Sequence, residues 1–131
     1  MAANALRREA LLDAAIAVLA ERGTRGLTFR AVDANAGTPV GTASNYFANR
    51  DELIAQVFEQ IGVRLAPDPD EVDRLSQRPP SKELFADYVR YIVTRLSAER
   101  AVTIALFELR LEASRNPRIA DLVQNWVSTG F

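Results

Sequence analysis

The sequence predicts an all-helical protein, and three features of its 131 residues support this prediction. Apolar residues recur at three- and four-residue spacing along most of the chain, which is typical of amphipathic helices. Gly, Pro, Ser, Thr and Asn fall between these segments, where helix caps and turns are expected. No segment shows the apolar–polar alternation of a half-buried strand.

Three helices with very short connections are expected in the first half of the chain. The first has one apolar face and ends near a glycine. The second is capped by Thr28 and closes at Gly37. Thr38 and Pro39 then suit the N-cap and first position of a third helix that runs to Phe47. Two short helices across a tight, glycine-containing turn are the pattern of a helix-turn-helix.

Longer and more apolar helices are expected in the second half. Asn49 and Glu52 form a capping-box pattern at the start of a fourth helix. Residues 66–81 contain four Pro and four acidic residues, which predicts a linker with one helical turn. Three amphipathic helices follow, from about Lys82 to Leu96, from about Glu99 to Arg115, and from Asn116-Pro117 onward.

The composition excludes several classes of function. The chain has no Cys and no His, so disulfides, thiolate metal ligands and the commonest general base are absent. Without a paired-acid motif, we expect no catalytic residue, no metal and no cofactor. No apolar run approaches the roughly 20 residues that span a bilayer, so no membrane partner is expected. The net charge of −1 is uneven: residues 1–50 carry +2, although chance scatter would explain so small a surplus.

The third helix has little apolar surface for a core element. At 100° per residue, Ala43 and Phe47 share one face, with Val40 at its edge. Thr42 and Asn45 lie on the opposite side. The second helix of a helix-turn-helix enters the DNA major groove, where an Asn can pair with adenine through two hydrogen bonds. A connecting helix of a bundle would show the same spacing, so the spacing alone leaves both interpretations open.

Arg50 and Arg30 are candidates for phosphate contacts. Arg50 lies in the first turn of the fourth helix, where acidic residues are preferred and a cation is compatible with a docked phosphate. An ion pair with Asp51, or exposure to solvent, would explain Arg50 equally well. Arg30 lies in the second helix, which Thr28 opens with a hydroxyl that could meet a phosphate.

The block GLTFRAVDANAGTPVGTASNYFANRDELIAQVF, residues 26–58, resembles the DNA-binding region of the tetracycline-repressor (TetR) family. The resemblance covers about the first 60 residues. The positions that carry it are Thr28, Ala36-Gly37, Gly41-Thr42, Tyr46-Phe47 and Arg50-Asp51-Glu52-Leu53. With the helical positions above, it implies a DNA-binding set of Thr28, Arg30, Thr38, Pro39, Val40, Gly41, Thr42, Ser44, Asn45, Tyr46 and Arg50.

Three positions depart from the family's commonest pattern. Val40 stands where a basic residue is frequent, Ser44 where an aromatic residue is frequent, and Pro39 where Ser is common. Fewer charged contacts predict a shallower dependence of DNA affinity on salt.

The second half resembles the family only in being helical. The resemblance implies a ligand cavity between helices and a dimer interface in the last two helices. Family members continue for two helices after the position of Phe131, so we expect this domain to be incomplete and the interface to lie largely beyond it. The candidate cavity residues are Tyr88, Tyr91, Phe107, Glu108, Arg110, Glu112 and Trp126, although aromatic residues at this spacing usually belong to a core and Glu and Arg to a surface.

We therefore expect a cytoplasmic, one-component transcriptional regulator with a helix-turn-helix domain at residues 1–48 and a ligand-binding and dimerisation domain at residues 49–131. The resemblance implies a repressor that acts as a homodimer. It would bind double-stranded palindromic operator DNA, and a small molecule would release it from that DNA. The alternative is a helical ligand-binding or protein-interaction module without sequence-specific DNA binding, which Val40 and Ser44 favour.

Overall fold

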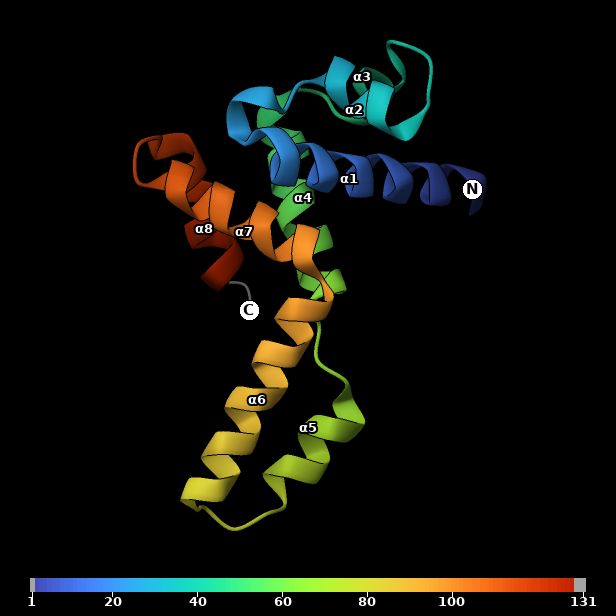
Figure 1. The fold of residues 1–131 in the computed structure, drawn as a ribbon. Helices are drawn as coiled ribbons and strands as arrows, with labels where there is room; N and C mark the ends of the chain where they lie inside the picture. The colour runs from blue at the N-terminus through green and yellow to red at the C-terminus, as the bar shows by residue number, and fades with distance from the viewer. Residues whose placement is uncertain (1, 129–131) are drawn as a thin grey trace.

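The computed structural model describes residues 2–128, and every regular element in that range is helical (Figure 1). The prediction of an all-helical fold is therefore confirmed. None of the helices in this range combines the length and the apolar character needed to cross a membrane. The elements are α1 (Ala2–Arg22), the 3-10 turn η1 (Thr24–Gly26), α2 (Phe29–Ala36), α3 (Thr42–Tyr46), α4 (Arg50–Arg64), α5 (Pro69–Ser76), α6 (Lys82–Ala98), α7 (Arg100–Ala113) and α8 (Pro117–Ser128).

One hydrophobic core joins the two halves of the chain. Helix α1 packs against α2, α4 and α7, and α8 packs against α4 and α7. Phe47 and Phe58 are among the largest fully buried side chains, and the ring centroid of Phe58 lies 5.3 Å from that of Trp126 on α8. The core therefore runs across the expected domain boundary after residue 48, and α4, α7 and α8 share it with the first three helices.

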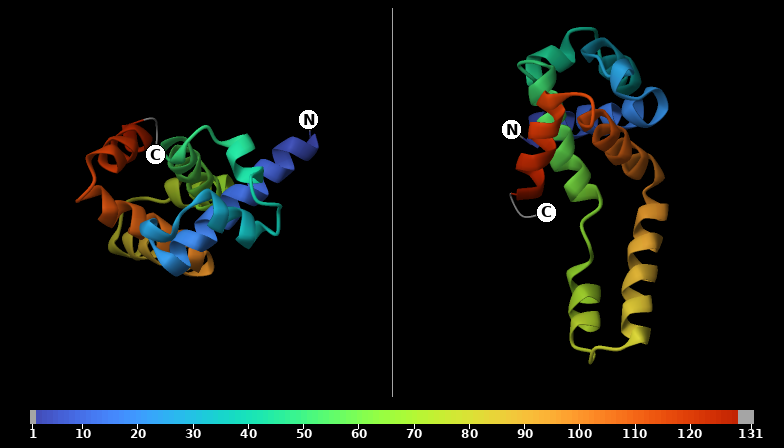
Figure 2. Two further views of the ribbon diagram at one scale, coloured as in Figure 1. Left: turned by 90° about the horizontal axis from the view of Figure 1, so that it is seen from above. Right: turned by 90° about the vertical axis from the view of Figure 1, so that its left-hand side faces the viewer.

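Helices α5 and α6 extend away from this core, as the views in Figures 1 and 2 agree. Residues 66–81, expected as a linker with one helical turn, contain the eight-residue helix α5. Asp68 caps it by accepting a hydrogen bond from Asp70 N–H (3.0 Å), and Pro69 suits its first position. Arg78 bridges to Asp87 of α6 at 2.6 Å, and this guanidinium holds the pKa of the Asp87 carboxyl below its usual value.

Candidate DNA-binding surface

Helix α2 begins and ends at the residues that the sequence predicts. The Thr28 hydroxyl oxygen accepts a hydrogen bond from Ala31 N–H at 3.0 Å, which satisfies one of the first backbone donors of the helix. Gly37 closes it in the left-handed conformation with φ 71°. Both caps are local, so α2 is defined by residues within one turn of its ends.

Helix α3 is shorter than predicted. It spans Thr42–Tyr46, so the expected start at Pro39 is wrong. Pro39 and Val40 belong to the preceding turn, and Gly41 occupies the N-cap position with φ 99°, a backbone conformation that an L side chain rarely adopts. Thr42 N–H donates to the Pro39 carbonyl at 3.1 Å and closes that turn. The helix therefore starts only after the chain has passed through the glycine.

The two faces of α3 divide largely as predicted. Ala43 and Phe47 are buried, whereas Asn45 is exposed and its side chain makes no hydrogen bond to another described residue. Tyr46 is half-buried at the edge. Val40, expected at the edge of the inner face, is 73% exposed because it lies in the turn rather than on the helix.

Two hydroxyl groups on the outer face of α3 turn back to the chain. The Thr42 hydroxyl donates to the Pro39 carbonyl at 2.7 Å, and the Ser44 hydroxyl donates to the Gly41 carbonyl at 2.8 Å. Each oxygen can still accept a hydrogen bond, but its proton is already used in the turn.

Arg8 of α1, which the sequence analysis did not single out, holds the end of α3. Its Nη1 donates to the Tyr46 carbonyl at 3.2 Å and to Gln56 Oε1 of α4 at 2.9 Å. The guanidinium carbon lies 5.3 Å from the Tyr46 ring centroid and 5.6 Å from that of Phe47. No sequence signal predicts these contacts, because 38 residues separate Arg8 from Tyr46.

Asp33 is a second residue that the sequence analysis missed. Its carboxylate lies at 1% exposure and accepts hydrogen bonds from the Thr38 hydroxyl, Gly41 N–H and Ala43 N–H. The hydroxyl of Thr38, a candidate DNA contact, is thus directed toward the protein interior. A signal was present in the sequence: Asp33 lies four residues after Phe29 and three before Ala36, on an apolar face of α2 where a charge is unusual.

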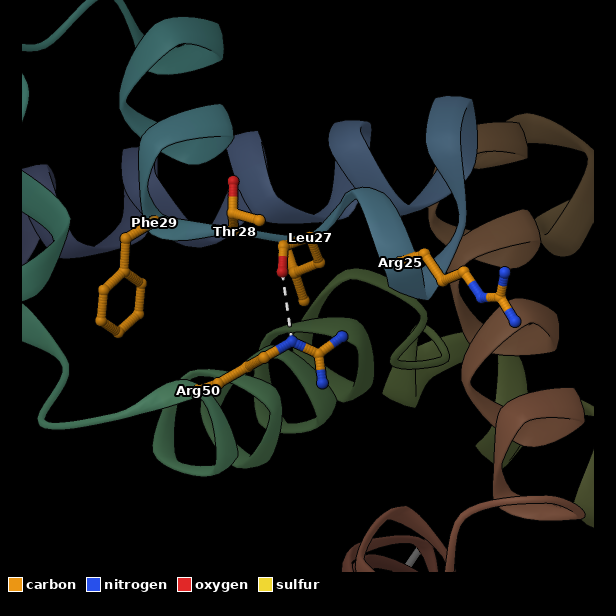
Figure 3. A pocket seen from close by; sticks show the side chains of 5 residues that line it. All are labelled: Arg25, Leu27, Thr28, Phe29 and Arg50. Carbon is orange, nitrogen blue, oxygen red and sulfur yellow. Dashed lines mark hydrogen bonds between the residues drawn. The ribbon is translucent and has the colours of Figure 1, made fainter.

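Arg50 makes contacts within the protein. Its Nε donates to the Leu27 carbonyl at 3.2 Å, and its Nη2 donates to the Thr24 carbonyl. Figure 3 shows the side chain directed from α4 toward the loop before α2. Asp51 pairs with Arg118 of α8 at 3.6 Å. An open cavity of about 490 Å³ adjoins these groups and is lined by Arg25, Leu27, Thr28, Phe29 and Arg50.

The candidate ligand residues of the second half do not come together at one site. Trp126 is buried against Phe58, the Tyr91 hydroxyl accepts a hydrogen bond from Asp68 N–H at 2.8 Å, and a Glu108 carboxylate oxygen lies beside Gly23. Tyr88 and Glu112 are half-buried, and Arg110 is exposed.

Phe107, the remaining candidate, lines a cavity of about 350 Å³ between α6 and α7. This volume lies at the lower end of the range for small-molecule sites. The cavity is mainly apolar with a few polar groups, and its lining comprises Val93, Leu96, Ser97, Arg100, Thr103, Ile104 and Phe107.

Solved structures with the same arrangement of helices include three regulators or binding proteins. The multidrug binding protein EbrR complexed with imidazole is 28% identical, with a TM-score of 0.71 over 94% of this chain and 68% of that chain. A TetR-family member from Streptomyces coelicolor A3 is 29% identical, with a TM-score of 0.74 over 94% of this chain and 70% of that chain. A transcriptional regulator from Rhodococcus sp. Rha1 is 22% identical, with a TM-score of 0.65 over 93% of this chain and 64% of that chain. At this identity the comparison shows only that the two folds are similar.

Two family models match most of the chain. The model of bacterial regulatory proteins of the tetR family matches residues 11–57, and a tetracyclin repressor-like C-terminal domain matches residues 80–131. A search of curated protein sequences gives no match. Members of this family are regulators rather than enzymes. The helix-turn-helix geometry and these matches together show that the chain belongs to the TetR family of transcriptional regulators.

Proposed function

We propose that this protein is a ligand-responsive transcriptional repressor in the cytoplasm that binds palindromic operator DNA as a homodimer. The observation that carries the proposal is the geometry of α3, whose inner face is anchored by buried Ala43 and Phe47 while Asn45 stands exposed without a partner among the described residues. A short helix so anchored presents its polar face to a major groove. Residues 1–48 supply this surface, and residues 49–131 supply effector binding and dimerisation.

The proposed contacts divide into base readers and phosphate contacts. Asn45 pairs with a base edge through its free amide, and the exposed Val40 offers an apolar contact to a thymine methyl group. The Thr28 hydroxyl, exposed Arg30 and the Tyr46 hydroxyl approach phosphates. The remaining members of the set shape or flank the surface; they are Thr38, Pro39, Gly41, Thr42, Ser44 and Arg50.

We place the effector in the cavity between α6 and α7. Helix α7 contacts both that cavity and α1, so a ligand there acts on the DNA-binding half through one rigid element. EbrR, which this chain resembles, is complexed with imidazole in one structure and with proflavin in another. Proflavin is therefore a reasonable first probe. It would release DNA by favouring the conformation that binds DNA poorly, which requires unequal affinity for the two states.

A fluorescence-anisotropy titration tests the DNA-binding proposal. Labelled DNA from upstream of the gene is titrated with the protein at several salt concentrations, beside a scrambled duplex of equal length. We expect preferential binding of the upstream DNA, with a shallow salt dependence because residues 31–49 contain no Lys or Arg. Equal affinity for both duplexes at low salt would refute it.

The second candidate is a ligand-binding module without sequence-specific DNA binding. The hydroxyls of Thr42 and Ser44 favour it, because both already donate to carbonyls of the preceding residues and so leave few free donors on the outer face of α3. Proflavin binding that persists in a protein unable to discriminate the two duplexes would support this alternative.

A further inference from the structure

Asp33 has an unusual environment for an ionised side chain. Among the described residues it is the only acidic one that is buried, and no basic side chain there forms an ion pair with it. A carboxylate removed from water is strongly destabilising unless hydrogen bonds compensate for the lost solvation. The partners that provide this compensation therefore indicate what the residue does.

Both oxygens of the Asp33 carboxylate bind the segment that leads into α3. Oδ1 accepts from the Thr38 hydroxyl at 2.9 Å and from Ala43 N–H at 2.8 Å, and Oδ2 accepts from Gly41 N–H at 2.9 Å. The three donors span the turn and the first residues of the helix. One side chain of α2 thus connects three points of the structure that presents the DNA-facing residues.

Helix α3 cannot hold this position by itself. It has five residues, far fewer than an isolated helix needs to be stable in water. Phe47 and the hydrogen bond from Arg8 to the Tyr46 carbonyl hold its C-terminal end, which leaves the N-terminal end with freedom to shift. The two amide bonds to Asp33 remove that freedom.

We propose that Asp33 is a positioning residue that sets the orientation of α3 and thereby the sequence specificity of the protein, without touching DNA. The inference rests on the proposed DNA-binding function. Because Asp33 is buried, it acts through the amides of Gly41 and Ala43 and through them on Asn45.

Asp33→Asn is the informative substitution because it keeps the size of the side chain and removes one acceptor oxygen. In either orientation of the new amide, its NH₂ group faces at least one N–H or O–H group from which the carboxylate had accepted a hydrogen bond. That hydrogen bond is then lost. Loss of a charge-assisted hydrogen bond corresponds to about a tenfold or larger change in an equilibrium constant. Electrostatics alone predicts a different result, since removing a negative charge strengthens the attraction to both duplexes and leaves their affinity ratio unchanged.

The experiment measures three quantities for native protein, Asp33→Asn and the exposed control Asp121→Asn, which removes the same charge far from α3. They are the affinity ratio between upstream and scrambled DNA, the thermal midpoint, and amide hydrogen exchange at Gly41 and Ala43 without DNA. We expect Asp33→Asn to reduce the ratio about tenfold or more and to speed exchange at both amides. Asp121→Asn should leave the affinity ratio and the exchange at both amides unchanged.

The outcomes separate the inference from the proposed function. If native protein does not discriminate the duplexes, the DNA-binding proposal fails, while faster exchange at Gly41 and Ala43 in Asp33→Asn would still establish the positioning contact. An unchanged ratio in Asp33→Asn overturns the inference. So does a lower midpoint with an unchanged ratio, because that marks a purely structural role.

A milder variant serves if Asp33→Asn does not fold. Thr38→Val removes one of the three donors and keeps both amide bonds, so the protein should fold, with its thermal midpoint lowered by about 4 °C. We expect a loss of discrimination smaller than in Asp33→Asn, because both amide bonds that hold the start of α3 remain. Discrimination equal to that of the native protein would overturn the inference.

Discussion

Replacing Arg50 with Ala tests whether this side chain supports the protein internally or contacts a phosphate. The guanidinium donates to the carbonyls of Thr24 and Leu27 and so connects α4 to the loop before α2. A hydrogen bond to a charged group contributes about 1.5–3 kcal/mol when it is shielded from water. Arg50 is exposed, and solvent competes for its donors, so we expect Arg50→Ala to lower the free energy of unfolding by about 1–2 kcal/mol in total.

Thermal unfolding followed by circular dichroism measures this loss. For a chain of this length, about 1 kcal/mol lowers the midpoint by roughly 4 °C, so the expected decrease is about 4–8 °C. The matched control is Arg30→Ala, which removes an exposed arginine from α2. Because the Arg30 side chain has no hydrogen bond or ion pair to another described residue, its removal should change the midpoint by less than about 2 °C.

The salt dependence of DNA affinity distinguishes the two arginines further. A phosphate contact contributes about 0.9 to the slope of log affinity against log salt concentration. We expect Arg30→Ala to reduce the slope by about this amount and Arg50→Ala to leave it unchanged, since Nε and Nη2 of Arg50 already donate to the carbonyls of Leu27 and Thr24. An unchanged midpoint together with a reduced slope in Arg50→Ala would refute the reasoning and identify Arg50 as a phosphate contact.

Three further predictions follow from the contacts. Asn45→Ala should cost about 1–3 kcal/mol of discrimination at one base position, measured by competition with single-base operator variants; an intact preference at every position would remove its assigned role. Trp126→Ala should destabilise the protein by about 3–5 kcal/mol in urea unfolding, because the ring is buried against Phe58; a loss below about 1 kcal/mol would contradict this. Arg78 lowers the pKa of Asp87, so their pair stabilises the α5–α6 hairpin above the ordinary pKa of Asp87 and loses this effect as pH falls through the lowered value. The protection factors of the α5 amides, which correct the exchange rates for the intrinsic effect of pH, should therefore fall on acidification, and less steeply in Asp87→Asn; equal pH dependence would argue against the pair.

Features defined by neighbouring residues could be predicted from the sequence. Thr28 caps α2, Asn49 caps α4 by accepting from Glu52 N–H at 2.8 Å, and Gly37 adopts the left-handed conformation. Each depends on residues within one helical turn. The apolar spacing likewise predicted the buried face of α3, because a period of 3.6 residues decides which side chains share a side.

Features that depend on distant residues could not be predicted in this way. The expected start of α3 was wrong because Asp33, eight residues before Gly41, draws the turn into a shape that local propensity does not specify. Helix α5 was underestimated for a local reason: proline and acidic residues indicate a linker, whereas Asp68 and Pro69 together begin a helix. Trp126 was a candidate for the ligand cavity, yet it packs on Phe58, and periodicity does not distinguish a core face from a cavity face.

The sequence by itself determined the helical class, the caps of α2 and α4 and the family resemblance, since these follow from local spacing and from the order of residues along the chain. Only the tertiary structure decided which polar side chains face DNA and which hold the protein together. Arg50 and Thr38 look like surface contacts in sequence, but in the folded chain their donors meet backbone carbonyls and the Asp33 carboxylate. The physical reason is that a donor binds the acceptor closest in space, and folding brings together acceptors that the order of residues leaves far apart.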